Sequence, residues 1–135
     1  MRLMAMPTLH FGAHRTTIAE TALEVGWDLT GRDPSPLGLE NAIAAIEDEL
    51  ARQHGSLVKG AAPVTRDATI RDIALAAGVP AGAEMTLAVE AVEQMFQRLA
   101  ARAPGVPAGR EFAGKLVILR ELMHHLEFPS IVIRA

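Results

Sequence analysis

Residues 78–85 read GVPAGAEM and residues 105–112 read GVPAGREF, so a short Gly/Pro segment occurs twice in the chain. Apolar residues after each copy keep the same spacing. In both copies glycine can end one helix, proline prevents its continuation, and glutamate suits the first turn of the next helix. This pattern predicts an internal repeat over 78–102 and 105–127, in which two loop–helix units form an antiparallel helix pair.

Apolar residues recur at helical spacing in four segments, which we expect to be helices: 38–54, 68–77, 84–102 and 110–127. The first carries a single apolar stripe whose members are three or four residues apart, as on an amphipathic helix. Four helices in a chain of this length favour a helix-dominated α+β fold.

The region before the first helix contains two competing signals. Residues Leu23–Thr30 alternate apolar and polar side chains, which is typical of a half-buried strand. Just upstream, Thr17–Glu20 has the spacing of a helix capping box. The longer alternation favours the strand, and the proline-containing segment Gly31–Pro36 is then expected to be a loop.

Other short strands are expected near the two ends of the chain. Arg2–Phe11 is one candidate, and the β-branched run Ile131–Ile133 is another. A brief strand is also expected at Leu57–Val58. We expect the strands from the chain ends to form one small sheet packed against the helices.

Size and composition exclude several classes of protein. The chain has 135 residues, of which 50% are hydrophobic, and a formal net charge of -3 at pH 7. These values indicate one domain, 1–135, with a real core. The near-neutral charge argues against polyanion binding by bulk electrostatics, and the absence of cysteine excludes disulfides and thiolate chemistry. No signal peptide or membrane span is indicated, so we expect a cytoplasmic protein with no membrane partner.

Glu121 and His124 are the candidate metal ligands. They lie three residues apart on a predicted helix, at the Glu-x-x-His spacing that carboxylate-bridged di-metal bundles use. Such bundles need a second copy of the motif, and the chain has none. The alternative is that His124 and His125 are partly exposed residues that interact favourably with the helix C-terminus.

His10, His14 and Arg15 form the candidate ligand-binding group. The two histidines are four residues apart, so they would share one face of either a strand or a helix. Together with Arg15 they could bind an anion. The alternative is a solvated surface at the end of a strand.

Residues Thr69–Val79 resemble the opening helix and turn of lactose-repressor-type helix-turn-helix regulators. The resemblance implies DNA binding by a second helix that starts directly after the turn. Here Pro80, Gly82 and Glu84 follow instead, and acidic residues repel phosphate. We therefore expect no nucleic-acid partner.

The apolar faces of the two repeat helices favour a homo-oligomer, most simply a homodimer, because a small domain covers few such faces by itself. The corresponding function is that of a small accessory or interaction protein without catalytic activity of its own, and no catalytic residue or cofactor is indicated. One alternative is a small-molecule-binding protein or enzyme with an apolar pocket between sheet and helices and histidine and arginine at its mouth. A metal-binding helical protein is the second alternative.

Overall fold

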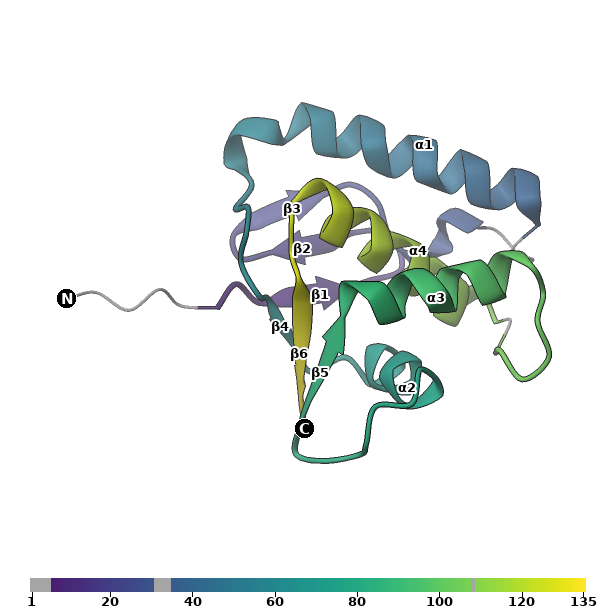
Figure 1. Ribbon diagram of the computed structural model, residues 1–135. Coiled ribbons are helices and arrows are strands. Elements are labelled where there is room, and N and C mark those ends of the chain that lie inside the picture. The colour runs from purple at the N-terminus through teal and green to yellow at the C-terminus, as the bar shows by residue number, and fades with distance from the viewer. Residues whose placement is uncertain (1–5, 31–34, 108) are drawn as a thin grey trace.

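The computed structural model describes residues 6–30, 35–107 and 109–135 as an α+β fold. Two small sheets lie beside a group of helices (Figure 1). The first sheet is an antiparallel meander: β1 (Leu9–Phe11), β2 (Thr16–Ile18) and β3 (Thr21–Leu23). The second has the spatial order β4-β6-β5: β4 (Val64–Thr65), β6 (Ser130–Arg134) and β5 (Glu84–Ala88). The α-helices are α1 (Pro36–Arg52), α2 (Ala68–Ala76), α3 (Val89–Ala100) and α4 (Arg110–His125).

One parallel bridge, between Thr8 and Val64, joins the two sheets. The Val64 amide donates to the carbonyl of Pro7 at 2.9 Å, and the Thr65 hydroxyl donates to the carbonyl of Leu9 at 2.9 Å. Because β4 also pairs with β6 in parallel, β1, β4 and β6 lie side by side and run in the same direction. β5 closes the other edge, antiparallel to β6.

α4 is the central helix of the core. It packs against α1, α2, α3 and the 3-10 helix η1 (Trp27–Thr30), and most of its side chains are buried. α3 runs antiparallel to it (Figure 1). Even the charged residues Lys115 and Glu121 of α4 are buried.

Three of the four predicted helices are confirmed, with boundaries shifted by a few residues, as α1, α2 and α4. Local capping explains two of their starts. The Ser35 side chain accepts a hydrogen bond from the Gly38 amide at 3.0 Å, and Asp67 accepts one from Ile70 at 3.0 Å. Gly78 follows α2 with a φ of +93°, the left-handed conformation that commonly ends a helix.

The predicted internal repeat is wrong, because its two copies adopt different structures. The segment predicted as helix 84–102 begins with the strand β5 and becomes helical only at Val89. Met85 and Leu87 are buried while Glu84 and Thr86 are exposed, which is a period-two pattern that β6 can pair with. The second copy leads directly into α4. The two Gly/Pro segments therefore share residues that interrupt a helix, but they do not share the structure that follows.

The apolar helix faces that favoured a homodimer are covered within the chain itself. Helix α4 is enclosed by α1, α2, α3 and η1. Among the described residues, the large hydrophobic side chains that remain exposed are Leu37, Val58 and Leu75, which belong to three separate segments. The fold therefore gives no support to a homodimer through these helices.

The predicted strand over Leu23–Thr30 is wrong beyond its first residue. β3 ends at Leu23, and residues 27–30 form η1. The chain leaves the sheet because the amides of Trp27 and Asp28 donate to the carbonyls of Gly12 and Ala13, each at 3.0 Å. Gly26 allows this approach, since a Cβ there would lie 2.3 Å from the Ala13 backbone. The competing capping-box helix is also absent, because Thr17 belongs to β2.

The other strand predictions have mixed outcomes. Ile131–Ile133 lies within β6 and is confirmed. Arg2–Phe11 contains β1, although residues 1–5 lie outside the described part, as do residues 31–34 of the predicted loop. Leu57–Val58 is not a strand; the nearest element is the 3-10 helix η2 (His54–Ser56). The chain-end strands β1 and β6 do not pair directly, because β4 lies between them.

Gly114 lies where α4 closely approaches the backbone of η1. A Cβ at this position would lie 2.0 Å from the carbonyl oxygen of Trp27 and 2.7 Å from its Cα. Glycine therefore lets α4 contact η1 backbone to backbone, and any side chain would force the two elements apart.

In the described part of the chain, no helix combines the length and apolar character that crossing a membrane requires.

Glu49 links α1 to the end of the first sheet. It is buried, and its Oε2 accepts a hydrogen bond from the Glu24 amide at 2.7 Å. The other carboxylate oxygen pairs with Arg52. The Glu24 hydrogen bond is the main reason that the pKa of Glu49 is lowered below its usual 4.5, and it outweighs the opposite effect of burial.

Replacing Glu49 with glutamine is expected to lower the free energy of unfolding at pH 7 by about 1 kcal/mol, because a charge-assisted hydrogen bond becomes a neutral one. Since the folded-state pKa is depressed, the stabilising effect is present above about pH 4.5 and is lost as the pH falls through the folded-state value. Urea unfolding of wild type and Glu49→Gln between pH 7 and pH 3 measures this. The exposed Glu40→Gln on the same helix is the control. If the difference in unfolding free energy between wild type and Glu49→Gln stays the same at acidic pH, the stabilising role assigned to the Glu49 carboxylate is contradicted.

Candidate functional site

Three basic side chains lie at the same level of three adjacent parallel strands. The register pairs Thr8 with Val64 and Thr65 with Ile133. Extending it by one or two residues aligns His10 of β1 with Arg66, which follows β4, and with Arg134 of β6. Aligned residues on neighbouring strands share a face of the sheet, and all three side chains are exposed.

These basic residues occupy the face opposite the core. Their preceding neighbours Leu9, Thr65 and Ile133 are buried and point toward the helices. The exposed face forms a cavity of about 240 Å³, which we call the strand-end pocket. Its lining residues are Thr8, His10, Val64, Thr65, Arg66 and Arg134.

The two arginines of the strand-end pocket have different partners. Arg134 pairs with Glu84 of β5 at 3.1 Å. Arg66 donates to the main-chain oxygen of Ala135, and within the described ranges no side-chain carboxylate lies at ion-pair distance from it. Among the described residues, Arg66 thus donates to a main-chain oxygen of Ala135 and pairs with no acidic side chain.

The predicted ligand group of His10, His14 and Arg15 is divided in the structure. His10 lines the strand-end pocket, whereas β1 ends at Phe11 and the other two residues follow in the turn to β2. A hydrogen bond of 2.8 Å from the Gly12 amide to the Arg15 carbonyl closes this turn. His14 lies 3.9 Å from Asp28, and Arg15 pairs with Glu24 at 3.0 Å.

The predicted metal pair Glu121 and His124 faces in two directions. His124 lies 3.5 Å from Glu93 of α3. Glu121 instead lies 3.3 Å from His125, the residue after His124. His125 also lies 3.3 Å from Glu47 of α1. α4 thus directs its two histidines toward different neighbouring helices, and Glu121 is grouped with His125.

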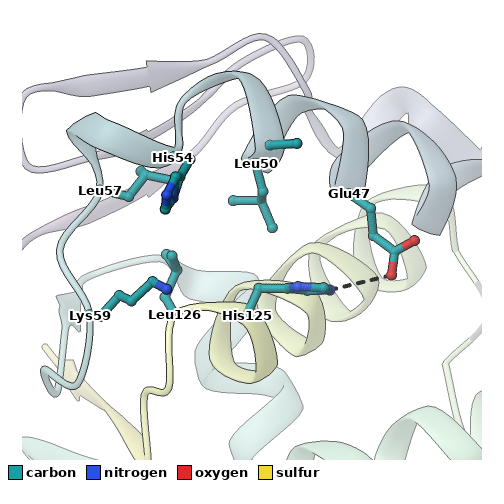
Figure 2. Close-up of a pocket in the computed structure, with 8 residues that line it drawn as sticks. Glu47, Leu50, His54, Leu57, Lys59, His125 and Leu126 are labelled. Carbon is teal, nitrogen blue, oxygen red and sulfur yellow. Dashed lines mark ion pairs between the residues drawn. The ribbon is translucent and has the colours of Figure 1, made fainter.

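A second cavity, of about 310 Å³, lies where α1 and α4 end; we call it the helix-end pocket (Figure 2). Its wall combines apolar side chains with ionisable ones: Glu47, Leu50, Ala51, His54, Leu57, Lys59, His125 and Leu126. Figure 2 shows Glu47 and His125 joined by their ion pair at one side of this cavity.

Arg120 connects the two sides of α4 electrostatically. It donates to Glu93 at 2.7 Å and to Glu121 at 2.9 Å, and its guanidinium lies over the Phe96 ring at 4.1 Å from the centroid. The hydrogen bond to Glu93 raises the pKa of Arg120 and lowers the pKa of Glu93. Arg120 consequently stays charged and holds the Glu121 carboxylate in place.

Four of these site residues were not identified from the sequence: Arg66, Arg134, Glu47 and His125. Arg134 follows the β-branched run of β6, so its place at a strand end could have been inferred. Arg66 follows a two-residue strand that has no recognisable sequence signal. The group of Glu47, Glu121 and His125 depends on how α1 packs against α4, which local spacing does not reveal.

Comparisons with known proteins show a similarity of fold but no match in sequence to a family model or a curated protein. No protein-family model matches the sequence, and no curated protein matches it. Among solved structures, the chain resembles the Aquifex aeolicus PPX-GPPA enzyme with a TM-score of 0.69 and 16% identity, over 96% of this chain and 52% of that one. A second structure, a Ppx/GppA family member from Aquifex aeolicus, matches with a TM-score of 0.70 and 16% identity, over 96% and 51% of the respective chains.

This likeness corrects the predicted function. The chain spans about half the length of the solved chains it matches, and at this identity the likeness concerns the fold alone. Nevertheless, nearly the whole chain adopts an arrangement found in an enzyme. The interpretation as an accessory protein without catalytic activity is therefore wrong, and the alternative of a small-molecule-binding protein or enzyme has the better support. The fold of this chain is thus similar to that of about half of the Aquifex aeolicus PPX-GPPA enzyme chain.

Proposed function

We propose that this chain is a ligand-binding domain of enzyme type that binds a small anionic molecule in the strand-end pocket. The observation that carries the proposal is the row of His10, Arg66 and Arg134 across three parallel strands. The ligand chemistry is a carboxylate or a phosphate, because both accept two parallel hydrogen bonds from a guanidinium.

The position of the pocket supports this proposal. In sheets with parallel strands, ligands bind outside the carboxyl ends of the strands. His10 is the middle residue of β1, Arg66 directly follows β4, and Arg134 ends β6. The proposed site lies on the exposed face of the sheet, whereas the sequence favoured a pocket between sheet and helices.

The charge distribution in the pocket also favours an anion. Glu84 neutralises Arg134 in part, while in the described part of the chain Arg66 donates to a main-chain oxygen of Ala135 and pairs with no acidic side chain. Thr8 adds a hydroxyl at the wall, which can donate a further hydrogen bond. The likeness to an Aquifex aeolicus enzyme supports assigning the pocket to ligand binding within an enzyme scaffold.

Replacing Arg66 with glutamine is expected to weaken the binding of inorganic phosphate at least tenfold, because a charge-assisted hydrogen bond contributes about 1.5–3 kcal/mol. Isothermal titration calorimetry of the untagged protein with sodium phosphate measures this. Titration with sodium acetate then decides between a phosphate and a carboxylate ligand.

The matched control is Arg15→Gln, which removes an exposed arginine outside the strand-end pocket. Its phosphate affinity should equal that of wild type. Absence of binding by either anion, or equal losses in Arg66→Gln and Arg15→Gln, would refute the proposed function.

A further inference from the structure

Three side chains from two helices converge beside the helix-end pocket. They are Glu47 of α1 and the pair Glu121 and His125 of α4. Each offers one ligand atom, and these atoms all lie within 4.8 Å of one another. The set is independent of the proposed anion site, because it shares no residue with it.

We propose that Glu47, Glu121 and His125 form a binding site for a divalent transition-metal ion, with zinc as its representative. Imidazole nitrogen and carboxylate oxygen are both common zinc ligands, with bonds of about 2.0–2.2 Å. Tetrahedral coordination at such lengths separates neighbouring ligand atoms by roughly 3.3 Å. His125 Nε2 lies 3.3 Å from Glu47 Oε2 and 3.3 Å from Glu121 Oε1.

The helix geometry preorganises two of the three ligands. Glu121 and His125 are four residues apart, so they lie on one face of α4 one turn from each other. The same i, i+4 spacing brings paired ligands together in helical zinc motifs. Glu47 approaches from α1, which packs directly against α4.

Arg120 acts as a positioning residue for Glu121. The Glu121 side chain is only 4% exposed, and Arg120 Nη1 binds its Oε2 at 2.9 Å. This contact leaves Oε1 directed toward His125. A hydrogen bond that fixes a ligating carboxylate is a regular feature of metal sites, since it reduces the cost of ordering the ligand.

The open side of the site faces solvent through the helix-end pocket. Glu47 and His125 both line this cavity and are 50% and 44% exposed. Figure 2 shows the two side chains at its edge. Three protein ligands beside a cavity leave one position for water or an exogenous ligand, which is the arrangement of accessible zinc sites and not of closed structural ones.

The experiment is a titration of the untagged, chelator-treated full chain with zinc chloride, followed by calorimetry and by metal analysis after dialysis. One ion per chain is expected. Both Glu47→Gln and His125→Gln should weaken zinc affinity at least tenfold, because each removes a ligand. Addition of zinc should also raise the melting temperature of wild type, and this increase should be lost in both variants.

His124→Gln is the matched control, because it removes the neighbouring histidine, which faces Glu93 instead. Its zinc affinity should equal that of wild type. Metal-free melting temperatures and circular dichroism spectra of the variants separate lost coordination from lost folding. Less than a tenth of an ion per chain, or a loss of affinity in His124→Gln as large as in His125→Gln, would overturn the site. Zinc binding that persists in both ligand variants would also overturn it.

Discussion

Gly114→Ala is expected to lower the free energy of unfolding by about 3 kcal/mol or more, which corresponds to roughly 10 °C in melting temperature. The new Cβ would lie 2.0 Å from the Trp27 carbonyl oxygen, so α4 and η1 must separate. The Cβ meets backbone atoms of Trp27, so no flexible side chain can move to relieve the clash. Thermal and urea unfolding of the variant measure the loss.

The control for this prediction is Gly55→Ala. No atom lies within 4 Å of the position that a Cβ on Gly55 would take, and this residue does not have a positive φ, so alanine fits without strain. Its stability should stay within about 0.5 kcal/mol of wild type. A Gly114→Ala protein as stable as Gly55→Ala would show that α4 and η1 do not approach each other this closely.

Lys115→Met is expected to cost about 3 kcal/mol, because it removes the cation from a buried ion-pair network. The Lys115 side chain is only 6% exposed, and its Nζ lies 2.7 Å from both Asp67 and Glu111. Methionine keeps the length of the side chain but leaves Asp67 without its charged partner. Urea unfolding at pH 7 measures the difference.

Asp67→Asn provides the test of mechanism for Lys115. Asparagine caps a helix about as well as aspartate, so the N-cap of α2 is retained while the charge is removed. The double variant should lose clearly less stability than the two single variants added together. Additive losses would show that the ion pair between Lys115 and Asp67 contributes nothing by itself.

Elements with local signals could be predicted from the sequence. α1, α2 and α4 have apolar patterns longer than two turns, and α1 and α2 begin at capping residues, Ser35 and Asp67. β6 was evident from its β-branched residues. The strand β4 has two residues and exists only because β1 and β6 lie on either side of it. Nothing in the residues of β4 specifies that pairing.

The error at residues 84–88 has a different origin. Polar and apolar residues alternate over this segment in the sequence, as on a half-buried strand. The resemblance of 78–85 to 105–112 nevertheless favoured a helix in both places. The same five residues, GVPAG at 78–82 and at 105–109, therefore precede a strand in one place and a helix in the other. Pairing with β6, a contact between distant parts of the chain, decided the outcome.

The candidate sites could be predicted only in part for the same reason. His10 was identified, but it meets Arg66 and Arg134 through strand registers that join distant segments. On a helix, residues three and four positions after Glu121 are both its neighbours, so spacing does not decide between His124 and His125. The packing of α1 and α3 against α4 decides it, through Glu47 and Glu93.

The strand order β4-β6-β5 has a consequence for synthesis on the ribosome. β6 is the last of these strands to be translated, yet it lies in the middle of its sheet. Until β6 emerges, β4 and β5 lack the strand that pairs with both of them. The edges that later pair with β6 are open to intermolecular pairing during this time. The nascent chain therefore completes this sheet only by inserting β6 between two segments already made, which is a late, long-range step.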